Sequence, residues 1–201
     1  MIKKKLYGKT ERLTKADEKH IVTEKIDGSN LAFFKLDGVL HIAQRNGIYT
    51  LSEAEEVTYK GLRGWLADHG EVLQDSLNEN SAIVGEWVGM GRLMYAFENR
   101  FQMFAKANVY DEMELVRIKY DPVMFVYPFV QQEIPDFIGE VPLVNISAVM
   151  PTIPDLDILY EAYLRFVKRD VEGFIVYSGD GVRKYVRNKN GHVEPHKESY
   201  L

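Results

Sequence analysis

Two stretches of the chain carry the alternation of apolar and polar residues that is typical of a β-hairpin. Residues 30–47, NLAFFKLDGVLHIAQRNG, predict two strands joined at Asp37-Gly38, a pair that supplies the positive φ angles of a tight turn. Residues 171–188, VEGFIVYSGDGVRKYVRN, predict a second hairpin around a Gly-Asp-Gly turn. Lys25 is expected just before the first strand of the first hairpin, and Arg45 at the end of its second strand.

Two other stretches have helical spacing. Residues 52–77 place acidic and apolar residues at a helical period, but Gly61, Gly64 and Gly70 interrupt it, so we expect two short helices. Residues 155–170, DLDILYEAYLRFVKRD, predict the clearest helix of the chain, with Asp155 as N-cap. Its apolar face consists of Leu156, Leu159, Tyr160, Tyr163 and Val167.

Residues 81–89 and 100–111 are rich in apolar, β-branched and aromatic residues and predict further strands. Residues 120–150 contain prolines and short apolar runs, which indicate strands and loops without fixing their positions. Because the strands do not alternate regularly with helices, we expect an α+β fold of antiparallel β-sheets flanked by helices, not a doubly wound parallel sheet.

Composition narrows the class of protein. The chain has 201 residues, of which 46% are hydrophobic and 27% charged, which is enough for a sizeable core, and we expect one domain over residues 1–201. It has no cysteine, which excludes disulfides, thiolate zinc sites and a thiol nucleophile. We see neither a signal peptide nor a membrane span and therefore expect a cytoplasmic protein without membrane contact. The net charge of −5 argues against bulk coating of nucleic acid but leaves room for a local basic groove.

Residues 22–34, VTEKIDGSNLAFF, contain the first candidate for chemistry. A lysine is almost fully protonated at neutral pH, so a nucleophilic lysine needs neighbours or a metal that help it lose a proton. Gly28 allows a sharp turn behind Lys25, and Asp27 could support a metal. Taken alone, these residues also fit an ordinary charged turn at the entry of a hairpin.

The order of the motifs along the chain adds to this signal. TEKIDGSN, RNG, GEWVG, FQMF, VEGFIVY and RKYVR follow one another between Thr23 and Arg187. This series resembles the nucleotidyltransferase motifs of covalent polynucleotide ligases, and most of all the RNA ligases of the T4 RNA ligase 2 type. The resemblance implies a nucleotidyltransferase (adenylation) domain of the ATP-grasp-like ligase type and an ATP-dependent RNA ligase activity. Such an enzyme transfers AMP to a lysine, then to a 5′-phosphate end, and finally joins that end to a 3′-hydroxyl.

The resemblance also implies a role for each matching residue around the nucleotide. Lys25 matches the lysine that attacks the α-phosphate of ATP and carries AMP, and Glu24 matches a position at the adenine. Asn30 and Arg45 match positions near the nucleotide and the reacting RNA ends. Glu86 matches the acid that bonds the ribose hydroxyls.

The remaining motifs supply an aromatic, an acid and basic residues. By the resemblance, Phe104 stacks on adenine, with Phe101 as the other candidate, and Glu172 is the acid associated with the catalytic metal. Lys184 matches the lysine that contacts phosphate, with Arg187 as its helper. On a regular strand Lys184 and Arg187 point to opposite faces, so the identity of the second basic residue stays open.

The chemistry of nucleotidyl transfer agrees with these residue types. The reaction depends on positioning and on charge stabilisation, so it needs basic residues around the phosphates and a divalent metal held by carboxylates. We expect ATP as the nucleotide and Mg²⁺ or Mn²⁺ as the metal, held by Glu172 and Asp27. The histidines show no spacing that indicates zinc.

Alternative functions remain at this level. Taken singly, Glu86 also fits an exposed strand acid, Phe104 a core aromatic and Glu172 a cap. A DNA ligase or capping enzyme commonly carries a further C-terminal OB-type domain, whereas only residues 188–201 follow Arg187, and we expect no such domain here. The substrate is expected to be RNA ends or a nicked duplex, with grip supplied by this domain or by a partner protein. A non-catalytic nucleotide-binding module and an unrelated structural protein complete the list, and the oligomeric state stays open.

Overall fold

The computed structural model describes residues 11–12, 20–45, 47–109, 113–118, 135–142, 144, 156–178, 181–187 and 193–195. These residues fall into two compact units. The first unit holds the described residues between 27 and 118 and between 135 and 140, and the second unit holds the others. That residues 1–201 act as one adenylation domain stays a prediction.

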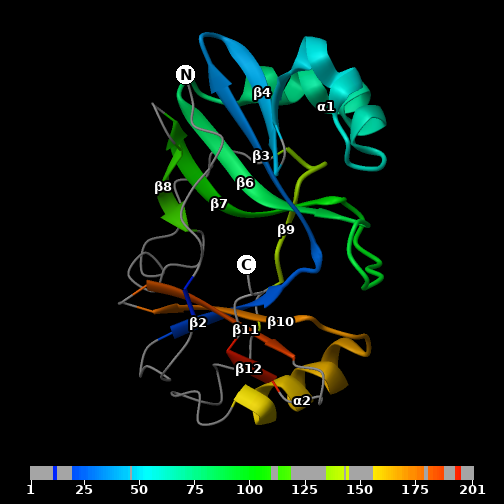
Figure 1. Cartoon of the computed structure of the whole chain (residues 1–201), viewed down its shortest axis with the longest axis vertical. Helices are drawn as coiled ribbons and strands as arrows, with labels where there is room; N and C mark the ends of the chain where they lie inside the picture. The colour runs from blue at the N-terminus through cyan, green and yellow to red at the C-terminus, as the bar shows by residue number, and fades with distance from the viewer. Residues whose placement is uncertain are drawn as a thin grey trace. The chain divides into compact units, whose positions relative to one another are not determined.

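The first unit contains a seven-stranded sheet in which the strand order is β5-β4-β3-β6-β7-β8, with β9 beside β7 (Figure 1). All its neighbouring strands are antiparallel except β7 and β9. The strands are β3 (Gly28–Leu36), β4 (Val39–Gln44), β5 (Gly47–Thr50), β6 (Ser81–Val88), β7 (Phe101–Val109), β8 (Met113–Ile118) and β9 (Gly139–Glu140).

The first predicted hairpin is confirmed as β3 and β4. Asp37 and Gly38 have φ angles of 52° and 75°, as a tight two-residue turn requires. The carboxylate of Glu79 accepts hydrogen bonds from both of their N–H groups, at 2.5 and 3.0 Å. Lys25 lies just before this hairpin, as expected, and it is the last residue of β2 (His20–Lys25), which belongs to the other sheet. The partner of β2 is a strand far along the chain, and no local pattern could indicate that pairing.

The segment between β5 and β6 forms a 3₁₀-helix, η1 (Leu51–Glu56), and one α-helix of 15 residues, α1 (Leu62–Ser76). Two helical elements were expected here, and Gly61 does lie between them, but α1 is longer than expected because it continues through Gly64 and Gly70. A Cβ atom on Gly70 would lie 2.6 Å from Leu51, so this glycine permits the close packing of α1 and η1. The buried side of α1 packs with Phe33 and Trp87 on one face of the sheet.

The second unit contains a sheet of order β1-β11-β10-β2, with β12 beside β11 (Figure 1). The second predicted hairpin is confirmed in its strands β10 and β11, while its turn at residues 179–180 lies outside the described residues. The elements are β1 (Glu11–Arg12), β2 (His20–Lys25), α2 (Leu156–Val167), β10 (Gly173–Ser178), β11 (Gly181–Arg187) and β12 (Val193–Pro195).

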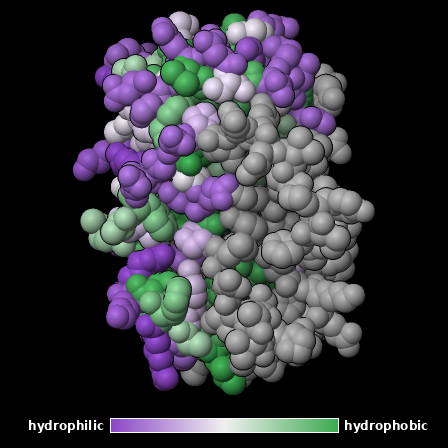
Figure 2. Space-filling model, turned by 180° about the vertical axis from the view of Figure 1, so that it is seen from behind, coloured by the Kyte–Doolittle hydropathy of each residue, from purple (hydrophilic) through white to green (hydrophobic). Residues whose placement is uncertain are grey.

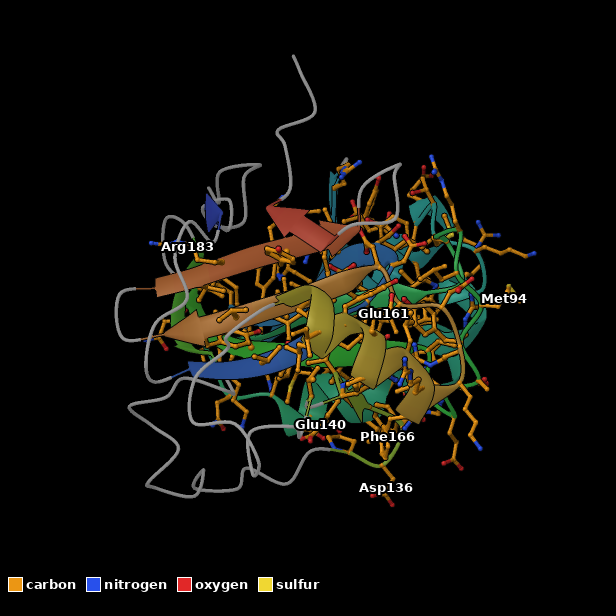
Figure 3. The ribbon with its side chains drawn as sticks, turned by 90° about the horizontal axis from the view of Figure 1, so that it is seen from below. Met94, Asp136, Glu140, Glu161, Phe166 and Arg183 are labelled. Atoms are coloured by element: carbon orange, nitrogen blue, oxygen red, sulfur yellow. The ribbon has the colours of Figure 1, made fainter. Side chains whose placement is uncertain are left out.

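Helix α2 confirms the predicted helix and covers one face of this sheet. Tyr160 and Tyr163 are buried against Phe174, at ring distances of 6.0 and 5.8 Å. Glu161 and Phe166 lie on the outer side of the helix, as Figure 3 shows. The predicted N-cap, Asp155, lies outside the described residues.

The fold class is α+β with mainly antiparallel sheets, as predicted; the parallel pairs are β1–β11 and β7–β9. Most of residues 120–150 lies outside the described part of the chain. None of the helices that the structure describes has the length and apolar character needed to cross a membrane. On the face shown in Figure 2, hydrophilic side chains cover much of the first unit at the top, with apolar ones interspersed.

Candidate functional site

The candidate nucleophile Lys25 meets the candidate metal ligand Glu172 in the second unit. The Lys25 Nζ donates a hydrogen bond to the Glu172 Oε2 at 2.5 Å, although the two residues are 147 positions apart. The side chain of Lys25 is 23% exposed and that of Glu172 30% exposed, so the pair is half-buried but reachable from solvent. The structure therefore brings together the two residues that the first and the VEGF motifs contribute.

The strand register explains this meeting. Lys25 ends β2, Glu172 directly precedes β10, and Gly173 lies opposite Lys25 in the ladder between these strands. Gly173 also lies opposite Val186 of β11. A Cβ atom on Gly173 would collide with the backbone oxygen of Tyr185, so only glycine lets β10 run between its two neighbours here.

Lys184 lies on the same face of this sheet as Lys25. Directly paired residues of antiparallel strands point to the same face, and residues two apart along a strand do so as well. Lys184, Ile175 and Thr23 form one row across the sheet, and the next row contains Lys25. Arg187 has the alternate position on β11, and its side chain lies outside the described residues.

Thr23 is a residue that the sequence reasoning did not single out. It is fully buried, on the same face as Lys25, and its hydroxyl has no hydrogen-bond partner among the described residues. A buried hydroxyl without a partner is a position where a bound group can complete a hydrogen bond. Its place two residues before Lys25 on a strand was the signal that could have indicated it.

Glu24 points to the opposite face, toward α2. It is 1% exposed, and its carboxylate accepts hydrogen bonds from Arg169 and Tyr163. Contact of Glu24 with adenine stays a prediction. Neither Arg169 nor Tyr163 was expected at the site, and no motif in the sequence indicates them.

In the first unit, Asn30 and Glu86 lie side by side. They are directly paired between β3 and β6, and Gln102 of β7 continues the same row. The Asn30 side chain donates to the backbone oxygen of Gly85 at 3.3 Å. These residues lie on the sheet face that is opposite to α1, and Glu86 is half-buried.

The two candidates for the adenine-stacking aromatic differ in burial. Phe101 is fully buried in the core beneath α1, where its ring packs edge-on against Phe33 at 5.0 Å. Phe104 is half-buried and packs on the other face, the one that carries Asn30 and Glu86. It lies where the register between β6 and β7 shifts, and such a β-bulge re-aims a side chain. These differences favour Phe104, whose role stays a prediction.

Tyr59 connects several predicted residues of the first unit and was missed by the sequence reasoning. Its hydroxyl donates to the backbone oxygen of Asn30 at 2.9 Å and accepts from the N–H of Arg45 at 3.3 Å. Burial raises the pKa of Tyr59 above its ordinary value of 10.0, and the negative charge of Glu86 adds to the shift. Arg45 itself is exposed at the end of β4.

Asp27, a predicted metal ligand, anchors a loop. Its Oδ2 accepts hydrogen bonds from the N–H groups of Arg92 and Leu93 at 2.6 and 2.9 Å. Its own N–H donates to the Tyr95 hydroxyl at 2.8 Å. Within the described residues, no cluster of three or more His, Asp or Glu side chains is placed to hold a metal. The metal predictions for Asp27 and Glu172 remain untested.

Comparison with known protein families identifies a family that the chain matches. The model of the RNA ligase family matches residues 18–188, a range that includes Lys25, Glu172 and all other predicted site residues. A search of curated proteins found no match.

Proposed function

Because the chain belongs to the RNA ligase family, we propose that it is an ATP-dependent ligase of the T4 RNA ligase 2 type that works through a lysyl-AMP intermediate. The observation that carries this proposal is the ion pair between Lys25 and Glu172 at 2.5 Å. A half-buried amine beside a carboxylate, within the range that the family model matches, has the residue types that nucleotidyl transfer needs.

In the proposed first step, the Lys25 amine attacks the α-phosphorus of ATP. A phosphorus–nitrogen bond forms, the bond to the β-phosphate oxygen breaks, pyrophosphate leaves, and the amine loses a proton to solvent. In the second step, the 5′-phosphate of RNA attacks the same phosphorus, which releases Lys25 and leaves AMP on the RNA end. In the third step, a 3′-hydroxyl attacks the RNA phosphate, a phosphodiester bond forms and AMP leaves.

The other predicted residues supply binding and charge. Lys184, on the face of Lys25, is proposed to contact the phosphates, with Arg187 as its helper. Glu86 is proposed to bond the ribose, Phe104 to stack on adenine, and Asn30 and Arg45 to contact the nucleotide and the RNA ends. Glu24 is the predicted residue at the adenine.

A divalent cation fits this chemistry at Glu172. Mg²⁺ commonly keeps several waters and takes only one or two carboxylates together with substrate phosphates, so the single partly exposed carboxylate of Glu172 suits it. Asp27 fits less well, because its Oδ2 already binds two backbone N–H groups. When bound, Mg²⁺ or Mn²⁺ would neutralise charge on the phosphates.

The proposal is tested by incubation with ATP labelled at the α-phosphate, with GTP in parallel, in Mg²⁺ or Mn²⁺. A denaturant-stable, acid-labile AMP adduct is expected from ATP, visible on a denaturing gel and by intact mass. Lys25→Ala should abolish the adduct, whereas Lys60→Ala, which changes an exposed lysine of the first unit, should retain it. An adduct that persists in Lys25→Ala, or no adduct under any condition, would refute the mechanism.

A nick-sealing assay tests the RNA specificity. Duplexes with an all-RNA, an RNA–DNA hybrid or an all-DNA nick are compared with the same enzyme and ATP. Sealing of the RNA nick is expected, and a preference for the all-DNA nick would overturn the RNA assignment.

A further inference from the structure

The connection between α2 and β10, residues 168–172, is attached to the end of β2 by two ion pairs. Lys25 pairs with Glu172 at 2.5 Å on one face of the sheet. Glu24 pairs with Arg169 at 2.5 Å on the other face. The charges are crossed, since β2 offers an acid followed by a base, and the connection offers a base followed by an acid.

The second of these pairs is the more completely bonded. Two nitrogens of Arg169 donate to the two oxygens of Glu24, at 2.5 and 2.7 Å, in the bidentate geometry that gives arginine–carboxylate pairs their strength. The Tyr163 hydroxyl donates to Glu24 Oε2 at 2.9 Å. The Glu24 side chain is 0% exposed and that of Arg169 24% exposed.

The backbone on both sides of this pair is also fixed. The N–H of Glu24 donates to the backbone oxygen of Pro142 at 2.9 Å. At the end of α2, the N–H of Lys168 donates to the backbone oxygen of Leu164 at 2.9 Å. The Tyr160 hydroxyl donates to the backbone oxygen of Val171 at 2.8 Å. The pair of Arg169 and Glu24 therefore connects the end of β2 directly to the segment that leads to Glu172.

We infer that Arg169 is a positioning residue for Lys25, acting through Glu24, an inference that rests on the proposed function. Arg169 pairs with Glu24, the neighbour of Lys25 on β2. Its bonds to Glu24 fix the backbone next to Lys25, while its own position in the connection fixes the segment that carries Glu172. The bonds hold the amine and the carboxylate within reach of each other.

A purely structural role is the competing explanation. A buried ion pair is a poor source of net stability, because the cost of removing both charges from water offsets much of their attraction. Removal of one partner, however, strands a buried charge and destabilises the fold. The test must therefore separate folding from positioning.

The first experiment measures single-turnover lysyl-AMP formation in Arg169→Ala. Misplacement of a reacting group by about 1 Å can cost about 100-fold in rate, so a loss of about this size is expected at saturating ATP, with the Kd for ATP little changed. Free guanidinium, at concentrations that do not unfold the protein, should restore part of the rate. Arg165→Ala changes an exposed arginine of α2, one turn before the connection, and should show neither the loss nor the rescue. A wild-type rate in folded Arg169→Ala overturns the inference.

The second experiment uses the double variant Glu24→Gln/Arg169→Met, which removes both charges. Its midpoint of chemical unfolding should lie closer to that of the wild type than the midpoint of Arg169→Ala does, because no buried charge is left without a partner. The rate of lysyl-AMP formation should stay low, because the bidentate bonds are lost. Recovery of stability and rate together would show a structural role only.

The third experiment does not depend on catalysis. The protein without nucleotide is labelled with an amine-selective acylating reagent, and the labelled peptides are quantified by mass spectrometry. Labelling of Lys25 relative to exposed Lys60 should rise several-fold in Arg169→Ala if Arg169 holds Lys25 at Glu172. If the wild type forms no lysyl-AMP adduct, the proposed function fails, but the labelling still decides the role of Arg169. Unchanged labelling of Lys25 in Arg169→Ala overturns the positioning role.

Discussion

At the scale of single residues, the ion pair of Lys25 with Glu172 and the proposed attack by Lys25 on ATP need different forms of the lysine side chain. An ion pair contains the ammonium form of lysine, whereas attack on phosphorus needs the neutral amine. The contact at 2.5 Å therefore describes the resting arrangement, and the amine must leave the carboxylate and lose a proton before it reacts.

Replacement of Glu172 by glutamine tests this arrangement. Glu172→Gln keeps the shape of the side chain but removes its negative charge, so we expect lysyl-AMP formation to slow by about 10²–10³-fold, a size typical for the loss of one electrostatic group at a reacting centre. Single-turnover measurements over a range of Mg²⁺ concentrations give the effect. Glu161→Gln, at an exposed position of α2, is the matched control and should react normally. A wild-type rate in Glu172→Gln would exclude a role of this carboxylate.

Asp27 allows a metal ligand to be distinguished from a loop anchor. The two backbone N–H groups that it accepts also suit the oxygen of an amide. As an anchor, Asp27→Asn should cost less than about 1 kcal/mol of the free energy of unfolding, and Asp27→Ala about 1–3 kcal/mol, because Ala leaves both donors without an acceptor. Urea unfolding measures both values. A strong rise in the Mg²⁺ requirement of Asp27→Asn, without loss of stability, would instead support metal binding.

Tyr59 predicts a pH dependence of stability. Its folded-state pKa is raised above 10.0, chiefly by burial, so the folded state favours the neutral phenol. The stability contributed by this shift is fully present below the ordinary pKa and is lost as the pH rises through the raised one. Tyr59→Phe should cost about 1 kcal/mol at neutral pH through the lost hydrogen bonds. The difference in free energy of unfolding between the wild type and Tyr59→Phe should then become smaller as the pH rises above the ordinary pKa of tyrosine. A difference that stays constant over that pH range, measured by urea unfolding, would contradict the argument.

At the scale of elements, the sequence predicted what local signals determine. The first hairpin follows from Asp37-Gly38, and α2 follows from the spacing of Leu159, Tyr160 and Tyr163. It could not predict that β2 pairs with β10, since this ladder joins segments far apart in the chain. Nor could it predict that at Gly70, inside α1, the missing Cβ leaves room for the side chain of Leu51, since this contact is tertiary.

The residues of the candidate site also fall into those that local motifs predicted and those that only the tertiary structure identifies. The motifs predicted Lys25 and Glu172, and the structure brings them together. Arg169 and Tyr59 were not predicted, because each is linked to the site by a hydrogen bond to a residue distant in sequence. Arg169 bonds Glu24 and Tyr59 bonds Asn30, and no local sequence pattern indicates such bonds. The partner of a buried charge is determined by tertiary packing.

Replacement by alanine should change the stability of the protein in opposite directions at two glycines. In Gly173→Ala the new Cβ would meet the backbone oxygen of Tyr185, so we expect a loss of about 1–3 kcal/mol of stability from overpacking, together with slower lysyl-AMP formation. Gly64 lies inside α1 with nothing within 4 Å of an added Cβ, so Gly64→Ala should stabilise the helix by about 0.5–1 kcal/mol. Urea unfolding of both variants gives the comparison. Equal effects would mean that β10 and β11 can separate without cost.

At the scale of the whole molecule, the predicted residues belong to both compact units. Glu24, Lys25, Glu172 and Lys184 belong to the second unit, and Asp27, Asn30, Glu86 and Phe104 belong to the first. The chain passes from one unit to the other between Ile26 and Asp27, inside the KIDG motif. Each unit can therefore be probed by its own variants, with lysyl-AMP formation as the common readout.

The net charge of the chain predicts how RNA binding depends on salt. With a formal charge of −5, binding must depend on a few local contacts with phosphate and not on a broad basic surface. Each contact contributes about −0.7 to the slope of log K against log salt for a single strand, so we expect a slope no steeper than about −3. Lys184→Ala should weaken binding to all sequences alike and make the slope shallower by about one contact. Fluorescence anisotropy at several salt concentrations measures these slopes, and a wild-type slope near −7, about ten contacts, would reveal a basic surface that the charge balance conceals.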